Sequence, residues 1–82
     1  MTPDKKINPI FAAVGHRIRV RRVEQKMKQS DLAEKVGMVS QHISQFERGE
    51  RRIGIDHLVA IAKALDCSPS YLLRDFEHQD AA

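Results

Sequence analysis

The sequence predicts an all-α fold, a compact bundle of five helices, and three observations lead to this prediction. Apolar residues recur at three- and four-residue intervals through most of the 82-residue chain, which is the spacing of one face of an α-helix. A helix-capping residue followed by proline occurs twice, and this pair is typical of a helix start. The strand signal is weak, because apolar and polar residues alternate only over residues 18–21, inside a longer helical pattern.

The first helix is expected to begin at Asn8-Pro9 and to end near residue 25 or 26. Asparagine caps a helix well, and proline suits the first helical position because its missing N–H would be unpaired there. Phe11, Val14 and Ile18 follow at helical spacing. The arginines of the expected exposed side are Arg17, Arg19 and Arg21.

Two short helices joined by a tight turn come next. We expect the second helix over about 29–36 and the third over about 40–48. Gly37 and Gly49 end them, since glycine is common just after a helix. The residues expected to face the core are Leu32, Ala33 and Val36 in the second helix and Ile43 and Phe46 in the third.

The fourth and fifth helices complete the predicted bundle. The fourth is expected over about 55–65, with one apolar stripe formed by Ile55, Leu58, Ile61, Ala62 and Leu65. Ser68-Pro69 opens a short fifth helix that ends at about Arg74. We therefore predict one domain over 8–76, between tails at 1–7 and 77–82.

The composition argues against several classes of protein. Cys67 is the single cysteine, so it excludes an internal disulfide and any zinc site that needs two cysteines. The histidines form no metal-binding pair, and no serine has a credible base beside it, so we expect no metal, no cofactor and no enzymatic site. A chain without an apolar run of 18 residues or an apolar signal core is expected in the cytoplasm and not at a membrane.

The charge is distributed unevenly along the chain. Residues 1–53 hold twelve Lys and Arg against six Asp and Glu, whereas residues 54–82 hold two against five. A basic first part beside an acidic end favours a surface that faces a polyanion, although a merely solvated face would have the same composition.

The segment 29–49 is the informative part of the sequence. It is predicted to form two short helices and a glycine-containing turn, which is the helix-turn-helix arrangement whose second helix enters the major groove of DNA. With Ile43 and Phe46 buried, four polar residues face outward and are not needed for packing of the core: Ser40, Gln41, Ser44 and Gln45. Glutamine can pair with adenine N6 and N7 together, and serine can bond to any base edge.

The chain also resembles a known family from about residue 15 to residue 73. Ile18-Arg19, Gln29-x-x-Leu32-Ala33, the run 43–49 and the spacing of Leu58, Ile61 and Leu65 are similar to the Cro/CI-type, or XRE, helix-turn-helix family. Residues 67–73 are similar to the end of the DNA-binding domain of lambdoid phage repressors.

This resemblance implies roles for individual residues. It implies base contacts for Ser40, Gln41 and Gln45, and phosphate or minor-groove contacts for Gln29, His42, Arg51 and Arg52. It also implies an ion pair between Arg22 and Glu47 that joins the first helix to the third. The sequence departs from the family before both short helices, where Lys28 and Val39 stand in place of a capping serine or threonine. An alternative for Ser40 is therefore that it caps the third helix itself, in which case its hydroxyl would bond to a backbone N–H and not to a base.

The function predicted from these residues is sequence-specific binding of double-stranded DNA by a transcriptional repressor. One domain offers few base contacts, so we expect a homodimer on a two-fold symmetric operator, joined through the fifth helix, Leu73 and Phe76. Three alternatives stay open: an antitoxin that also binds a protein toxin, a restriction–modification controller protein and, disfavoured by the polar and basic surface, a protein-interaction adaptor.

Overall fold

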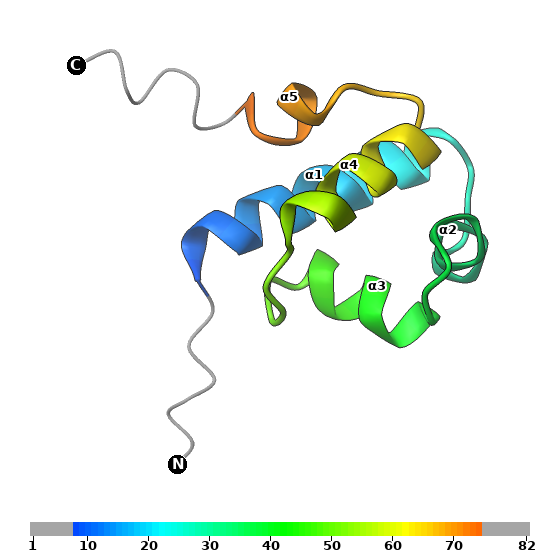
Figure 1. Ribbon diagram of the computed structural model, residues 1–82, viewed down its shortest axis with the longest axis horizontal. Coiled ribbons are helices and arrows are strands. Elements are labelled where there is room, and N and C mark those ends of the chain that lie inside the picture. The colour runs from blue at the N-terminus through cyan, green and yellow to red at the C-terminus, as the bar shows by residue number, and fades with distance from the viewer. Residues whose placement is uncertain (1–7, 75–82) are drawn as a thin grey trace.

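The computed structural model describes residues 8–74 and confirms the all-α prediction for them, with five helices and no strand. The helices are α1 (Pro9–Glu24), α2 (Gln29–Val36), α3 (Ser40–Glu47), α4 (Ile55–Ala64) and α5 (Pro69–Leu72) (Figure 1). The bounds of α2 are as predicted, and the other four helices begin as predicted but end one or two residues earlier. The predicted tails at 1–7 and 77–82, and Phe76, lie outside the described residues.

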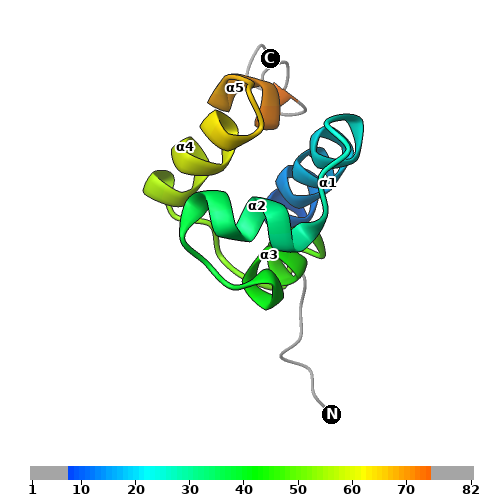
Figure 2. The ribbon, with the colours of Figure 1, turned by 90° about the vertical axis from the view of Figure 1, so that its right-hand side faces the viewer.

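All five helices contribute to a single hydrophobic core. α3 packs against both α1 and α2, and α4 packs against α2 and α5. In both orthogonal views α3 lies on the side of the molecule opposite α5 (Figures 1 and 2). The largest fully buried side chains are Ile18, Leu32, Ile43, Phe46, Ile61, Leu65 and Leu72. Burial of each such side chain contributes about 1.5–3 kcal/mol.

Both predicted cap-and-proline starts are present. The Asn8 side chain accepts a hydrogen bond from the Ile10 N–H at 2.8 Å, and α1 begins at the following proline. The Ser68 hydroxyl accepts from the Tyr71 N–H at 3.3 Å at the start of α5. Each cap satisfies a backbone donor that the helix itself leaves unpaired.

Helices α1 to α4 all end in the same backbone motif. After each one, a residue with positive φ is followed by a backbone N–H that donates to a carbonyl five residues earlier, as in a Schellman turn. Gly37 and Gly49 occupy this position after α2 and α3, as predicted. Lys26 and Asp66 occupy it after α1 and α4, with φ of 59° and 57°, although the left-handed region is unfavourable for a side chain such as lysine.

The backbones of α1 and α3 approach each other closely at two glycines. A Cβ on Gly15 would lie 1.9 Å from the carbonyl oxygen of Phe46. A Cβ on Gly49 would lie 2.6 Å from the Cα of Ala12. The start of α1 therefore fixes the end of α3 and the loop that follows it.

Two predictions about exposure are wrong. Ile55 does not join the buried stripe of α4, because 79% of it is exposed. It is the first residue of the helix, where the side chain points back past the helix end and away from the core. Arg21 is not on a freely exposed face: its Nε and Nη2 donate to the carbonyls of Leu65 and Asp66 at 3.0 and 2.9 Å.

Candidate nucleic-acid interface

α3 presents a polar surface on the side away from its buried residues. Ile43 and Phe46 are fully buried, whereas Ser40 and Gln41 are exposed. Within the described part of the chain, the side chain of Gln41 makes no hydrogen bond. Gln45 is half-buried. It follows Gln41 by four residues, about one helical turn, so the two side chains lie on the same face of α3. This face therefore holds amide groups that can bond to an external partner.

Ser40 does not cap α3, so the alternative role for its hydroxyl does not hold. Val39 is the N-cap and no side chain caps this end, while Ser40 is the first helical residue. Its position inside the helix removes its hydroxyl from the capping geometry and leaves it on the exposed surface. At the start of α2, Lys28 likewise offers no side-chain cap, but the Asp31 carboxylate accepts from the Lys28 backbone N–H at 2.9 Å.

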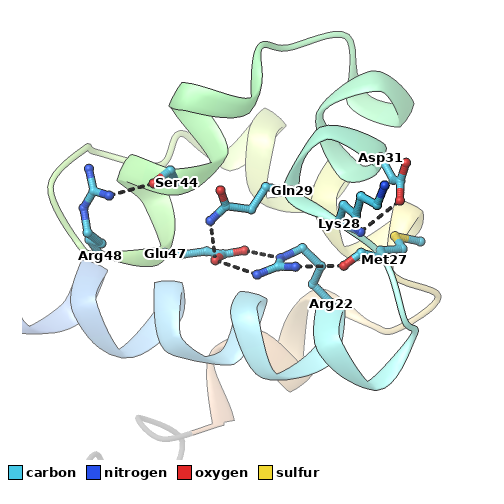
Figure 3. A network of polar contacts seen from close by, with 8 residues as sticks. All are labelled: Arg22, Met27, Lys28, Gln29, Asp31, Ser44, Glu47 and Arg48. Atoms are coloured by element: carbon cyan, nitrogen blue, oxygen red, sulfur yellow. Dashed lines mark hydrogen bonds and ion pairs between the residues drawn. The ribbon is translucent and has the colours of Figure 1, made fainter.

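Arg22 and Glu47 form an ion pair between α1 and α3, and the pair continues to the polar surface (Figure 3). The Arg22 Nε lies 2.6 Å from Glu47 Oε2, and the side chains are 11% and 4% exposed. Arg22 also donates to the backbone carbonyl of Met27 at 2.8 Å. Glu47 Oε1 accepts from the Gln29 amide at 3.0 Å. The network therefore fixes the amide of Gln29, the first residue of α2.

Three arginines lie at or just after the end of α3. Arg48 donates to the Ser44 hydroxyl at 2.7 Å (Figure 3). It also donates to a Glu50 carboxylate oxygen at 3.1 Å. Arg51 donates to the side-chain oxygen of Gln45 at 3.1 Å. Arg52 is exposed beside it. The sequence interpretation missed Arg48, although its four-residue spacing from Ser44 on one helix is the signal for this contact.

The remaining candidate residues lie around this surface. His42 is half-buried on α3. The exposed Arg51 and Arg52 line a hollow together with Gly49 and with Asn8 and Phe11 from the start of α1. The three classes of predicted contact residue, on α2, on α3 and in the loop after α3, thus lie on neighbouring elements. A polyanion bound along α3 would therefore contact the arginines at the C-terminal end of this helix.

Cys67 lies apart from this surface, after α4. It packs half-buried against the core. Burial raises the pKa of the Cys67 thiol, and the neighbouring Arg21 guanidinium opposes part of that rise. In residues 8–74 no cluster of His, Cys, Asp and Glu could hold a metal ion, and no helix is long and apolar enough to cross a membrane.

The comparison with known proteins agrees with this geometry. A sequence model described as helix-turn-helix matches residues 18–72, which is most of the described chain. The chain belongs to the XRE-type helix-turn-helix family. This family is a DNA-binding one, and its named relatives are transcriptional regulators. The predicted fold and family are therefore confirmed.

Two relatives are informative. An uncharacterized HTH-type transcriptional regulator, y4wC of Sinorhizobium fredii, is 42% identical over 71 residues, covering 87% of this chain and 50% of the relative. Repressor protein C2 of Salmonella phage P22 is 46% identical over 61 residues, 74% of this chain and 28% of the relative. The chain therefore spans about half or less of the length of these relatives.

Solved structures resemble the chain to a similar degree. The P22 c2 repressor, solved in complex with synthetic operator 9T, matches with a TM-score of 0.70 and covers 74% of this chain and 92% of that one. The restriction–modification controller protein C.AhdI from Aeromonas hydrophila matches with a TM-score of 0.73 and 29% identity, over 76% of this chain and 94% of that one.

Proposed function

We propose that the chain binds double-stranded DNA sequence-specifically as a transcriptional repressor, and that it does so as a homodimer on a two-fold symmetric operator. In this proposal α3 lies in the major groove and supplies sequence choice, while phosphate contacts supply most of the affinity. A dimer bound over a promoter excludes RNA polymerase sterically.

The observation that carries this proposal is the division of α3 into two faces. One face buries Ile43 and Phe46 completely, and the other exposes Gln41, whose amide has no hydrogen-bonding partner among residues 8–74. An unpartnered amide on a rigid helix is suited to a base edge, which offers donors and acceptors at fixed positions. The P22 c2 repressor, which is 46% identical and was solved with an operator, supports the same reading.

The proposed roles divide between bases and phosphates. Gln29 uses one N–H on Glu47, and its second N–H remains available to a phosphate oxygen. The residues proposed to contact bases are Ser40, Gln41 and Gln45, and those proposed to contact phosphate or the minor groove are Gln29, His42, Arg51 and Arg52.

The position of the dimer contact has two candidates. The fifth helix was predicted to carry it, but Leu72 is fully buried there and Leu73 is half-buried against the core. On α4, Ile55 and Val59 are 79% and 42% exposed and lie one turn apart. Sedimentation of Leu73→Lys and Val59→Lys on a full-site duplex distinguishes the candidates. Only the variant with a substitution in the true contact should fail to form the complex of two chains with one duplex. A 1:1 complex of the unmodified chain on one asymmetric half-site would contradict the dimer.

Selection of bound sequences from a random duplex library tests the function itself. Salt titrations of Gln41→Ala and Arg52→Ala, on the selected and on a scrambled duplex, then separate base from phosphate contacts. Gln41→Ala should cost about 1–3 kcal/mol on the selected duplex and little on the scrambled one. Arg52→Ala should weaken both similarly and reduce the slope of log affinity against log salt by about 1. If Gln41→Ala weakens both duplexes equally, α3 does not read the sequence.

A restriction–modification controller protein is a second candidate. The likeness to C.AhdI, with 29% identity over 76% of this chain, favours it. It shares the proposed DNA-binding surface and differs in the genes it regulates. Genes for a methyltransferase and an endonuclease beside this one would support it.

A further inference from the structure

Gln45 on α3 is in contact with Arg51 from the loop that follows. The Arg51 Nη1 lies 3.1 Å from the Gln45 side-chain oxygen. A guanidinium has only donors, so the glutamine amide must turn its oxygen toward Arg51 and its NH₂ group away from it. The contact therefore leaves the whole NH₂ group of Gln45, but only one lone pair of its oxygen, for a partner in the groove.

The backbone brings these two residues together. After α3 the chain turns at Gly49, whose φ is 74°, and the Glu50 N–H donates to the backbone carbonyl of Gln45 at 2.9 Å. This Schellman turn places the next residue, Arg51, beside Gln45. Because Gly49 also lies against Ala12 of α1, the loop holds a fixed position relative to α3.

We propose that Arg51 is a specificity-determining residue, which makes Gln45 a hydrogen-bond donor and so selects guanine at the base pair that Gln45 meets. The proposal rests on the proposed function, in which α3 reads the major groove. Adenine presents a donor beside an acceptor, and its pairing with glutamine uses the amide oxygen. That oxygen already accepts from the Arg51 guanidinium, so adenine N6 would have to donate to its second lone pair beside a cationic donor, which is less favourable. Guanine presents two adjacent acceptors, O6 and N7, which the NH₂ group of Gln45 can meet.

Arg52 provides a matched control for this proposal. It has the same charge as Arg51, is adjacent to it in the loop and is also exposed. No hydrogen bond joins Arg52 to Gln45 in the described residues. Loss of either arginine removes one cation near the phosphates, but only loss of Arg51 frees the amide of Gln45. A change of base preference that is confined to the Arg51 variant therefore reports the contact and not the charge.

The experiment compares the unmodified chain with Arg51→Ala, Arg52→Ala and Gln45→Ala. Each is selected against a random duplex library, and each is then titrated on duplexes that differ at one base pair. The base pair read by Gln45 is the one whose preference disappears in Gln45→Ala. There the unmodified chain should prefer guanine over adenine by about 5- to 150-fold. Arg51→Ala should lose that preference and bind adenine at least as well, while Arg52→Ala should keep it and bind all duplexes more weakly.

The outcomes separate the inference from the function on which it rests. If the unmodified chain prefers adenine at this base pair, or if Arg51→Ala keeps the preference for guanine, the role given to Arg51 is overturned and the proposed function stands. If the unmodified chain selects no sequence from the library, the proposed function fails and the inference fails with it. Equal thermal midpoints of the three variants and the unmodified chain ensure that folding does not account for the differences.

Discussion

Replacement of Glu47 by alanine tests the network that joins α1, α2 and α3. The Glu47 carboxylate is 4% exposed and accepts two hydrogen bonds from Arg22 and one from Gln29. Glu47→Ala leaves the Arg22 guanidinium, itself 11% exposed, without its counter-charge. It also leaves the Gln29 amide without its acceptor. The expected result is a large loss of stability, because a buried charge is left unpaired.

The size of this loss follows from the surroundings of Arg22. Removal of one partner of a buried ion pair costs about 3–5 kcal/mol. Arg22 keeps its hydrogen bond to the Met27 carbonyl and some contact with solvent, so we expect the lower end, about 3 kcal/mol. A chain of 82 residues has a total stability of about 4–12 kcal/mol. The thermal midpoint should therefore fall by about 12–24 °C.

Thermal and urea denaturation of the variant measure this change, and Glu24→Ala is the control. Glu24 lies 3.4 Å from Arg21 in an ion pair on the surface, where the glutamate side chain is 53% exposed. Loss of such a pair costs about 0–1 kcal/mol. If Glu47→Ala and Glu24→Ala shift the midpoint by the same amount, burial of the Arg22–Glu47 pair does not stabilise this fold as argued.

Three further predictions concern stability and reactivity. Lys26→Gly should raise the free energy of unfolding by about 0.5–1 kcal/mol in urea titrations. The relief of the strained left-handed backbone at this position should exceed the entropic cost of ordering glycine on folding. An unchanged midpoint would show that no strain is stored there. Gly15→Ala should lower the free energy of unfolding by at least about 3 kcal/mol, because the new Cβ would meet the Phe46 carbonyl. This loss should exceed the helix-favouring effect of alanine. A variant as stable as the unmodified chain would contradict the close approach of α1 and α3. Burial raises the pKa of the Cys67 thiol, so near pH 8 this thiol should be alkylated more slowly in the folded chain than in the urea-unfolded chain. The difference should shrink as the pH rises above the folded pKa. Equal alkylation rates would show that the thiol is not shielded. The same shift should contribute stability at neutral pH that is lost as the pH rises through the folded pKa.

The local elements of this fold follow from local chemistry. Asn8-Pro9 and Ser68-Pro69 start helices because each capping side chain bonds to a backbone N–H two or three residues away. Gly37 and Gly49 end helices because a positive φ costs glycine nothing. Such signals depend on a few neighbouring residues, so the sequence determines the elements, and the buried pair Ile43 and Phe46, without knowledge of the rest.

The tertiary structure decides what these signals cannot. Lys26 and Asp66 end helices with no local signature, because the packing of the helices compensates for an unfavourable φ. Ile55 fits the helical spacing and is nevertheless exposed, because periodicity gives the face of a helix but not where the core ends along it.

The polar surface shows the same division. The sequence by itself predicted its residue types: glutamines on α3 and arginines in the loop after it. The link from Arg22 through Glu47 to Gln29, and that from Arg51 to Gln45, join residues whose distance is set by the crossing of α1 and α3 and by the turn at Gly49. Which amide is held and which is free is therefore a property of the folded chain, because a hydrogen bond requires two groups at a separation that only packing establishes.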